Sequence, residues 1–199
     1  MKASPQPIRL VVLISGNGSN LQAIIDYIAE HNLPITIAAV ISNKADAYGL
    51  QRAASAGIAQ KVLPYTDFEN RQSYDHALQN LIDEYKPDLV VLAGFMRILS
   101  DEFVEHYSNR MMNIHPSLLP KYKGLHTHQR VLDAGDKEHG CSVHFVTPTL
   151  DDGPVILQAK INVNKNDTIE TLAARVHEQE HRIYPEAIHM FAENLLNKT

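Results

Sequence analysis

A near-continuous apolar run, Arg9–Ser15 (RLVVLIS), constrains the fold of this chain more than any other feature. It lacks the apolar–polar alternation of a strand with one face in water. Such runs are typical of strands buried on both faces, which occur in parallel sheets covered by helices. Ile35–Ser42 and Asp88–Phe95 have the same character. The sequence therefore predicts a parallel sheet at the centre of the fold.

Helical patterns separate these predicted strands, as crossovers between parallel strands require. After the first run, apolar residues recur at helical spacing: Leu21, Ile24, Ile25 and Ile28. Further helices are predicted at Tyr48–Ala56, Phe68–Tyr85, Leu125–Ala134 and Thr168–Leu196, the last interrupted at Pro185. Shorter strands are predicted at Ala59–Leu63 and Met111–His115.

Two alternating segments, Cys141–Thr147 and Val155–Val163, flank an Asp- and Gly-containing loop, Pro148–Pro154, and predict an antiparallel hairpin. We therefore expect an α/β, Rossmann-like fold. Its twisted, mostly parallel sheet has helices on both faces and gains antiparallel strands in the C-terminal half. Residues 1–199 are expected to form one domain, with residues 1–7 as a flexible lead-in.

The composition of the chain limits the classes of ligand and partner that we expect it to bind. The formal net charge is −5, which argues against a long nucleic acid, because such a ligand needs a basic face. The apolar runs are too short to span a bilayer, and the single cysteine, Cys141, allows no internal disulfide. We expect a cytoplasmic protein, monomeric or homodimeric, that acts on small molecules.

The loop Gly16–Asn20 joins a buried strand to a helix N-terminus. Backbone N–H groups and the helix dipole favour an anion there, and glycines let the backbone approach it. A dinucleotide fingerprint would need a third glycine where Leu21 stands, and the lysine of a P-loop is missing. The alternatives are one phosphate of a small molecule or a tight turn, and the position in the fold favours the phosphate.

Asn113 and His115 stand two positions apart at the end of a predicted strand, so both side chains point to the same face. An amide and an imidazole on one face can together stabilise an oxyanion. A structural role in a proline-rich turn is an equal alternative. Asp151 lies in the later loop, where a carboxylate reaching His115 would favour its protonated form. On its own, Asp151-Asp152-Gly153-Pro154 is better explained as a turn.

The segment His177-Glu178-Gln179-Glu180-His181 matches the H-E-x-x-H pattern of zinc proteases. No third ligand is evident except Glu193, and a phosphate-type loop has no role in a peptidase. We therefore expect no metal. His126-Thr127-His128 is likewise interpreted as the start of a helix.

Taken together, the motifs resemble the phosphoribosylglycinamide formyltransferases, a family of folate-dependent enzymes of purine synthesis. The resemblance runs from about Leu10 to Leu195. The matching stretches are VVLISGNGSNLQAII, ISNKADAYGL, DLVVLAGFMRILS, MMNIHPSLLPKYKGLHTH, HGCSVHFVTPTLDDGPVILQAK and RVHEQEHRIYP. It implies direct transfer of a formyl group from 10-formyltetrahydrofolate, the co-substrate, to the amine of glycinamide ribonucleotide, without a metal or a covalent enzyme intermediate.

The resemblance also implies roles for residues. Asn113, His115 and Asp151 would be catalytic, with His115 as the proton donor. The ribonucleotide would be bound by Gly18, Ser19, Asn20, His177, Glu178, Gln179 and Glu180. The folate would be bound by Arg71, Met96, Arg97, Ile98, Leu99, Asn113, Thr147, Pro148, Thr149, Leu150 and Asp151. The second carboxylate, Asp152, and a lysine where relatives often have proline, Lys123, depart from the family pattern.

Three rival functions remain at this point. A formyltetrahydrofolate hydrolase would use the same Asn-His-Asp set to activate water, but carries an extra N-terminal domain for which we expect no room. Methionyl-tRNA formyltransferase adds a C-terminal tRNA-binding domain, also not expected here. A non-catalytic sensor of a phosphorylated ligand would explain the glycine loop but not the convergence of Asn113, His115 and Asp151.

Overall fold

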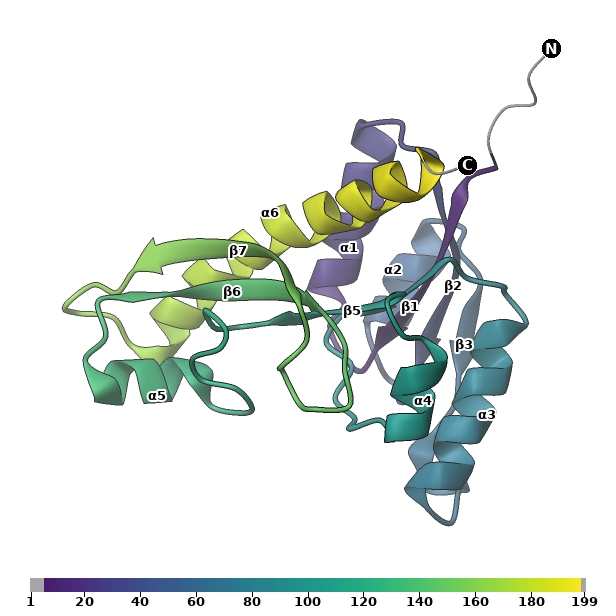
Figure 1. Cartoon of the computed structure of the whole chain (residues 1–199), viewed down its shortest axis with the longest axis horizontal. Coiled ribbons are helices and arrows are strands. Elements are labelled where there is room, and N and C mark those ends of the chain that lie inside the picture. Colours follow the sequence, from purple (N-terminus) through teal and green to yellow (C-terminus); the bar gives the residue numbers. More distant parts are fainter. Residues whose placement is uncertain (1–5, 198–199) are drawn as a thin grey trace.

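The computed structural model describes residues 6–197, which form a seven-stranded sheet flanked by helices (Figure 1). The strands are β1 (Ile8–Ile14), β2 (Ile35–Ser42), β3 (Gln60–Val62), β4 (Leu89–Leu92), β5 (Met111–His115), β6 (Glu138–Phe145) and β7 (Val155–Asn162). The helices are α1 (Ser19–Glu30), α2 (Gly49–Ser55), α3 (Arg71–Asp83), α4 (Asp101–His106), α5 (Thr127–Ala134) and α6 (Ile169–Leu196), with a 3₁₀ turn at Tyr65–Asp67. Most of the expected lead-in, residues 1–5, lies outside the described residues.

The strand order is β3-β2-β1-β4-β5-β6-β7. The first five strands in this order pair in parallel, whereas β5 with β6 and β6 with β7 pair antiparallel. The α/β, mostly parallel fold predicted from the sequence is thereby confirmed. The chain builds outward from β1 in one direction and then continues at β4 on the other side. Such a switch point opens a crevice at the carboxyl ends of β1 and β4.

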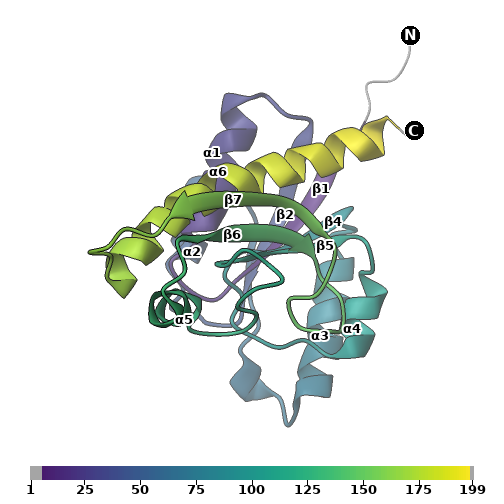
Figure 2. The same cartoon turned by 60° about the vertical axis from the view of Figure 1, so that its left-hand side comes forward.

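Two apolar cores cover the two faces of the sheet. Leu10, Val12 and Ile14 of β1 pack with α1, α2 and α6 on one face. Val11 and Leu13 pack with α3 and α4 on the other. Figures 1 and 2 show this division, with α6 running alongside α1 above the sheet and α3 beside α4 below it. Because successive residues of β1 enter different cores, the run is apolar throughout.

The helix α6 corrects one prediction. It continues through Pro185 as a single helix, Ile169–Leu196, where an interruption was expected. A proline inside a helix removes one backbone hydrogen bond and costs about 3 kcal/mol. Val176, Ile183 and Ile188 are buried by α6, and each such side chain contributes roughly 1.5–3 kcal/mol. Tertiary packing of this face therefore outweighs the local cost of the proline.

The sequence analysis missed α4, a helix of six residues. Its N-cap is Ser100, whose Oγ accepts a hydrogen bond from the Phe103 N–H at 3.4 Å. Only Phe103 and Val104 of this helix are buried, which is too little for a visible helical period. Every helix within residues 6–197 is too short or too polar to cross a membrane.

Candidate functional site

Side-chain hydrogen bonds join the loops at the carboxyl ends of β1 and β4. Ser15 Oγ donates to Asn43 Oδ1 at 2.6 Å and accepts from the Met96 N–H at 2.8 Å. Ser15 directly follows β1, and Met96 lies in the segment after β4. One hydroxyl thus ties the loops that follow three neighbouring strands, and it fixes where their side chains can meet.

The loop after β1 presents a helix N-terminus to this crevice. Gly18 occupies the position before α1 with φ +73°, in the left-handed region that favours glycine. Glycine has no side chain that could cap the helix, so the first N–H groups of α1 can bind an external anion. Ser19 and Asn20 begin α1, and Asn20 is buried.

Asn20 connects this loop to α6. Its Nδ2 donates to Glu180 Oε2 at 3.0 Å, and both side chains are buried. Burial raises the pKa of the Glu180 carboxyl, while the Asn20 hydrogen bond and the charges of His177 and His115 act in the opposite direction. Glu180 therefore lies within electrostatic range of His115 as well as against the glycine loop.

The other residues of the H-E-x-x-H segment are less buried than Glu180, and His177 Nε2 lies 3.5 Å from Glu180 Oε2. His177 and Glu178 are exposed, and Gln179 Oε1 accepts from the Arg182 guanidinium. The rings of His177 and His181 stack with centroids 5.9 Å apart. Over the described part of the chain, no three His, Cys, Asp or Glu side chains form a group that could hold a metal ion.

His115 and Asp151 are in contact. His115 Nδ1 lies 3.3 Å from Asp151 Oδ2, and the two side chains are 8% and 7% exposed. The other ring nitrogen, Nε2, lies 2.9 Å from the Tyr122 carbonyl oxygen. Both nitrogens thus face oxygen acceptors, and only the imidazolium form can donate to both at once.

The two neighbouring carboxylates, Asp151 and Asp152, have different surroundings. Asp151 is buried and also accepts a hydrogen bond from the Gly124 N–H at 2.9 Å. Asp152 is exposed and forms an ion pair with Lys123. Asp151 adopts a left-handed backbone conformation, φ +49°. The two departures from the family pattern, Lys123 and Asp152, therefore contact each other and not His115.

Asn113 faces a residue that the sequence analysis did not include, His144. The two are directly paired in register between β5 and β6, and Asn113 Nδ2 lies 3.5 Å from His144 Nε2. His144 Nδ1 lies 2.8 Å from the Phe145 carbonyl, so Nδ1 carries the proton and Nε2 accepts. Burial lowers the pKa of His144, in keeping with a neutral ring. The sequence signal that could have identified His144 was the alternation of side chains between the two faces of β6.

The predicted folate-binding residues form a less compact set. Met96 and Ile98 are 71% and 66% exposed, and Leu150 is 55% exposed, so apolar surface is open to a ligand here. Leu99 instead packs into the core beneath α3 and α4. The Arg97 guanidinium carbon stands 3.4 Å from the Tyr65 ring centroid. Arg71, Pro148 and Thr149 are exposed, and Thr147 Oγ1 donates to the Thr149 carbonyl at 3.2 Å.

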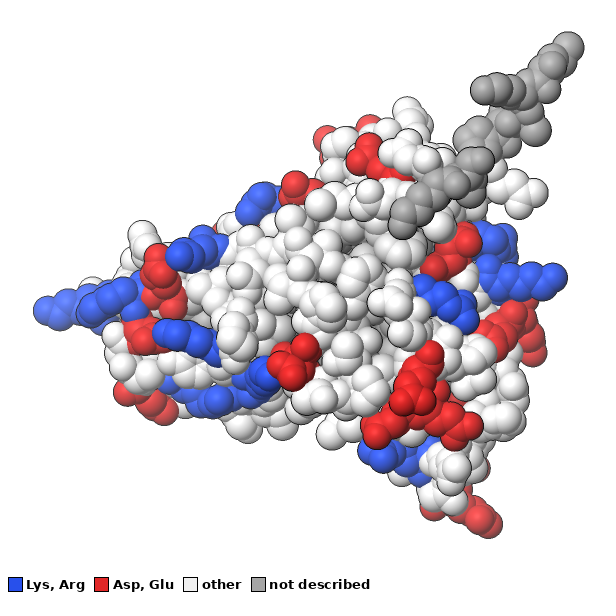
Figure 3. All heavy atoms as spheres, in the orientation of Figure 1, with Lys and Arg blue, Asp and Glu red and all other residues white. Residues whose placement is uncertain are grey.

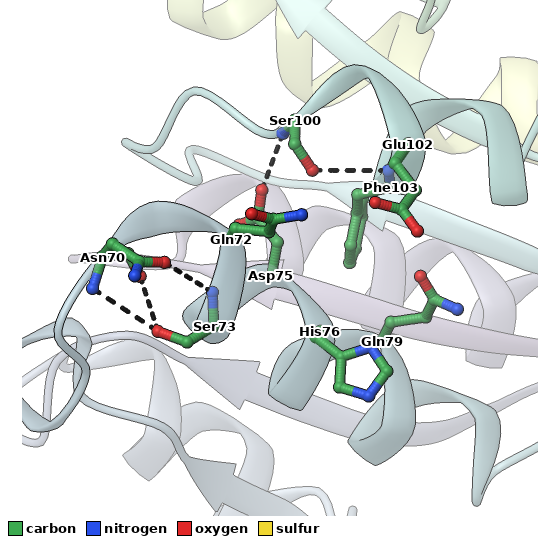
Figure 4. Close-up of a pocket in the computed structure, with 9 residues that line it drawn as sticks. All are labelled: Asn70, Gln72, Ser73, Asp75, His76, Gln79, Ser100, Glu102 and Phe103. Carbon is green, nitrogen blue, oxygen red and sulfur yellow. Dashed lines mark hydrogen bonds between the residues drawn. The ribbon is translucent and has the colours of Figure 1, made fainter.

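A separate cavity of about 360 Å³ lies between α3 and α4 (Figure 4). Eight of its nine lining residues have polar side chains, among them Asp75, whose Oδ2 accepts from the Ser100 N–H at 2.7 Å. None of the predicted site residues lines it.

On the face drawn in Figure 3, side chains of both charge signs surround an uncharged central region, and no continuous basic surface is present.

Residues 8–188 match the model of the family described as formyl transferase. The chain belongs to the formyl transferase family. It is 59% identical over 189 residues to the phosphoribosylglycinamide formyltransferase of Escherichia coli strain K12, across 95% of this chain and 89% of that protein. It is also 47% identical to human trifunctional purine biosynthetic protein adenosine-3, across 92% of this chain and 18% of that protein.

Solved structures of formyl transferases share the fold. The phosphoribosylglycinamide formyltransferase of Coxiella burnetii, in complex with CHES, gives a TM-score of 0.90 at 57% identity, over 94% of this chain and 88% of that chain. Glycinamide ribonucleotide transformylase 1 of Symbiobacterium toebii gives 0.93 at 46% identity, over 98% and 92%. As a formyl transferase, the chain is an enzyme of one-carbon transfer, as the sequence analysis predicted.

Proposed function

We propose that this enzyme transfers the formyl group of 10-formyltetrahydrofolate to the amine of N1-(5-phospho-D-ribosyl)glycinamide, a step of purine synthesis. Two relatives, 59% and 49% identical to this chain, carry the name of this activity. The observation that carries the assignment to this chain is the buried contact between His115 and Asp151, beside Asn113 and within electrostatic range of Glu180. This arrangement suits a reaction that passes through an oxyanion.

The ribonucleotide is assigned to the loop after β1 and the facing turn of α6. Its phosphate would bind the first N–H groups of α1 at Gly18, Ser19 and Asn20. His177–Glu180 would contact the rest of the ribonucleotide, because Glu180 already bonds Asn20. Once Asn20 occupies Oε2, the second oxygen of the Glu180 carboxylate remains as an acceptor for a substrate donor.

The folate is assigned to the surface formed by Met96–Leu99 and Thr147–Asp151, with Arg71 at its edge. The exposed side chains of Met96, Ile98 and Leu150 supply apolar contact for an aromatic ring system. Arg97, held against the Tyr65 ring, supplies positive charge for a carboxylate. In the proposed arrangement the formyl group would lie beside Asn113.

Each of the catalytic residues then has its own role in the proposed reaction. The neutral amine attacks the formyl carbon, a C–N bond forms, and an oxyanion develops that Asn113 Nδ2 and the His115 imidazolium stabilise. His144 accepts one Asn113 N–H and so orients the amide. Asp151 holds the Nδ1–H of His115. As the intermediate collapses and the C–N10 bond breaks, Nε2 gives its proton to N10 of the folate, in place of its contact with Tyr122, and the proton that the attacking nitrogen loses restores the imidazolium.

The test is an assay in which 10-formyltetrahydrofolate is mixed with the enzyme and either the ribonucleotide or water alone. We expect release of tetrahydrofolate only with the ribonucleotide, together with the formylated product. Equal release without the ribonucleotide would identify a hydrolase. No release in either mixture would contradict the proposed function and favour a non-catalytic role.

A further inference from the structure

The glycine loop is supported from outside by the start of α2. The Gly49 N–H donates to the Gly16 carbonyl at 3.0 Å. The two backbones also touch at Gly18, where an added Cβ would lie 2.6 Å from Gly49 Cα. Only glycine fits at such an approach, so α2 and the loop form one rigid unit. Residues of α2, which lie outside Gly16–Asn20 in the sequence, therefore help to set the shape of this loop.

Arg52, on α2, adds the side-chain part of this support. Its Nε donates to the Asn17 carbonyl at 2.8 Å, and its Nη2 donates to Asn17 Oδ1 at 3.0 Å. A third, longer bond runs from Nη1 to Gln22 Oε1 of α1 at 3.3 Å. The guanidinium carbon stands 4.9 Å from the Tyr48 ring centroid, which restrains the side chain further.

These bonds fix the peptide plane that precedes Gly18. The Asn17–Gly18 peptide is trans, so its N–H points away from its C=O. Because Arg52 holds the Asn17 carbonyl toward α2, the Gly18 N–H is directed away from α2. Successive backbone N–H groups directed to one side form an anion-binding concavity.

We propose that Arg52 is a positioning residue for the phosphate of the ribonucleotide. It orients the Gly16–Asn20 loop and supplies positive charge beside it. Its charge lies close to the first turn of α1, because Arg52 lines a hollow with Ser19 and Gln22 of that turn and His181 of α6. The inference rests on the proposed function, since it takes this loop as the phosphate site. No step of the formyl transfer requires Arg52 to contact the reacting atoms.

Arg52→Met and Arg52→Lys test the inference. Charged hydrogen bonds contribute about 1.5–3 kcal/mol, so Arg52→Met should raise the KM for the ribonucleotide roughly tenfold or more. The Kd for inorganic phosphate, measured by calorimetry, should rise by a similar factor. The kcat and the KM for the folate should change less than about twofold. Arg52→Lys should recover part of the loss, because it keeps the charge without the paired bonds.

Arg9→Met is the matched control. Arg9 Nε also donates to a loop carbonyl, that of Tyr85 at 2.9 Å, but it lies at the opposite end of β1. This variant should leave all four constants unchanged. Unaltered phosphate binding in Arg52→Met, or an equal loss for both substrates, would overturn the inference. If Arg52→Met does not unfold cooperatively, the same test is made with Arg52→Lys. Unaltered phosphate binding in that variant, or an equal loss for both substrates, would overturn the inference.

The phosphate measurement also separates the two proposals. If the unaltered enzyme transfers no formyl group to the ribonucleotide, the proposed function fails. Weaker phosphate binding in Arg52→Met would still support Arg52 as the residue that positions this loop.

Discussion

His115 Nδ1 lies 3.3 Å from Asp151 Oδ2, and a single loop hydrogen bond, from the Gly124 N–H, holds the same carboxylate oxygen. The imidazole is at the end of β5, and the carboxylate is in the loop between β6 and β7. In this antiparallel pair His115 is opposite Ser142, so the loop after Phe145 has to fold back along β6 to bring Asp151 to His115. The neighbouring carboxylate, Asp152, offers a natural comparison.

Asp151→Asn should lower kcat about 10²–10³-fold with little change in either KM, because the amide cannot orient and stabilise the imidazolium as the carboxylate does. Asp152→Asn is the matched control, since it removes only the exposed ion pair with Lys123. It should retain most of the activity. Steady-state kinetics of the two variants side by side would contradict the assignment if Asp152→Asn lost as much kcat as Asp151→Asn.

His115→Gln should also lower kcat about 10²–10³-fold, because the variant has no proton to give the leaving nitrogen. The Kd for inorganic phosphate should not change, since the phosphate loop is on another element. The measurement is single-turnover formyl transfer, with phosphate binding followed in parallel. Near-normal turnover would remove His115 from the mechanism.

His144→Gln tests the orientation of Asn113. The two side chains are in contact, so their substitutions should not add. We expect Asn113→Ala to lower kcat strongly, His144→Gln to lower it by roughly tenfold, and the double variant to resemble Asn113→Ala alone. A cycle of four kcat values measures this coupling. Strict additivity would mean that His144 acts independently of Asn113.

Tyr184→Phe should destabilise the fold without abolishing it. The buried Tyr184 hydroxyl lies 3.0 Å from the carbonyl oxygens of both Leu92 and Met112, where β4 and β5 run side by side. Leaving these acceptors unsatisfied costs about 1–3 kcal/mol. Tyr27→Phe, whose ring stacks on His31 near the surface, should change the free energy of unfolding by much less. Urea denaturation of both variants checks the difference.

Acidification should destabilise the protein between about pH 6.5 and pH 4. Burial lowers the pKa of His139 from 6.5 to about 4, next to His128, whose pKa is also lowered. The unfolded chain binds a proton below 6.5, whereas the folded chain excludes it until about 4. The stabilisation from neutral His139 is complete above pH 6.5 and is lost as the pH falls through this window. His139→Gln should therefore show a shallower fall in urea midpoint, and an unchanged slope would contradict this origin.

The parts of the fold that could be predicted from the sequence are those with a strong local period. The buried run at Arg9–Ser15 predicted β1, and the apolar spacing from Leu21 to Ile28 predicted α1. The start of α3 was less predictable: Phe68 was expected, whereas the capping box of Asn70 and Ser73 begins the helix at Arg71. The continuity of α6 through Pro185 could not be predicted, since it depends on burial against β6 and β7.

For the site, the sequence by itself determined the chemical groups: a glycine loop before a helix, an amide and an imidazole on one strand face, and a carboxylate in a turn. Their convergence was decided only by the tertiary structure. The pairing of β5 with β6 brought His144 to Asn113, and the folding of the loop after β6 placed Asp151, and not Asp152, against His115. The physical reason is that such contacts join segments far apart in the chain, and local preference carries no information about which of two adjacent carboxylates will face inward.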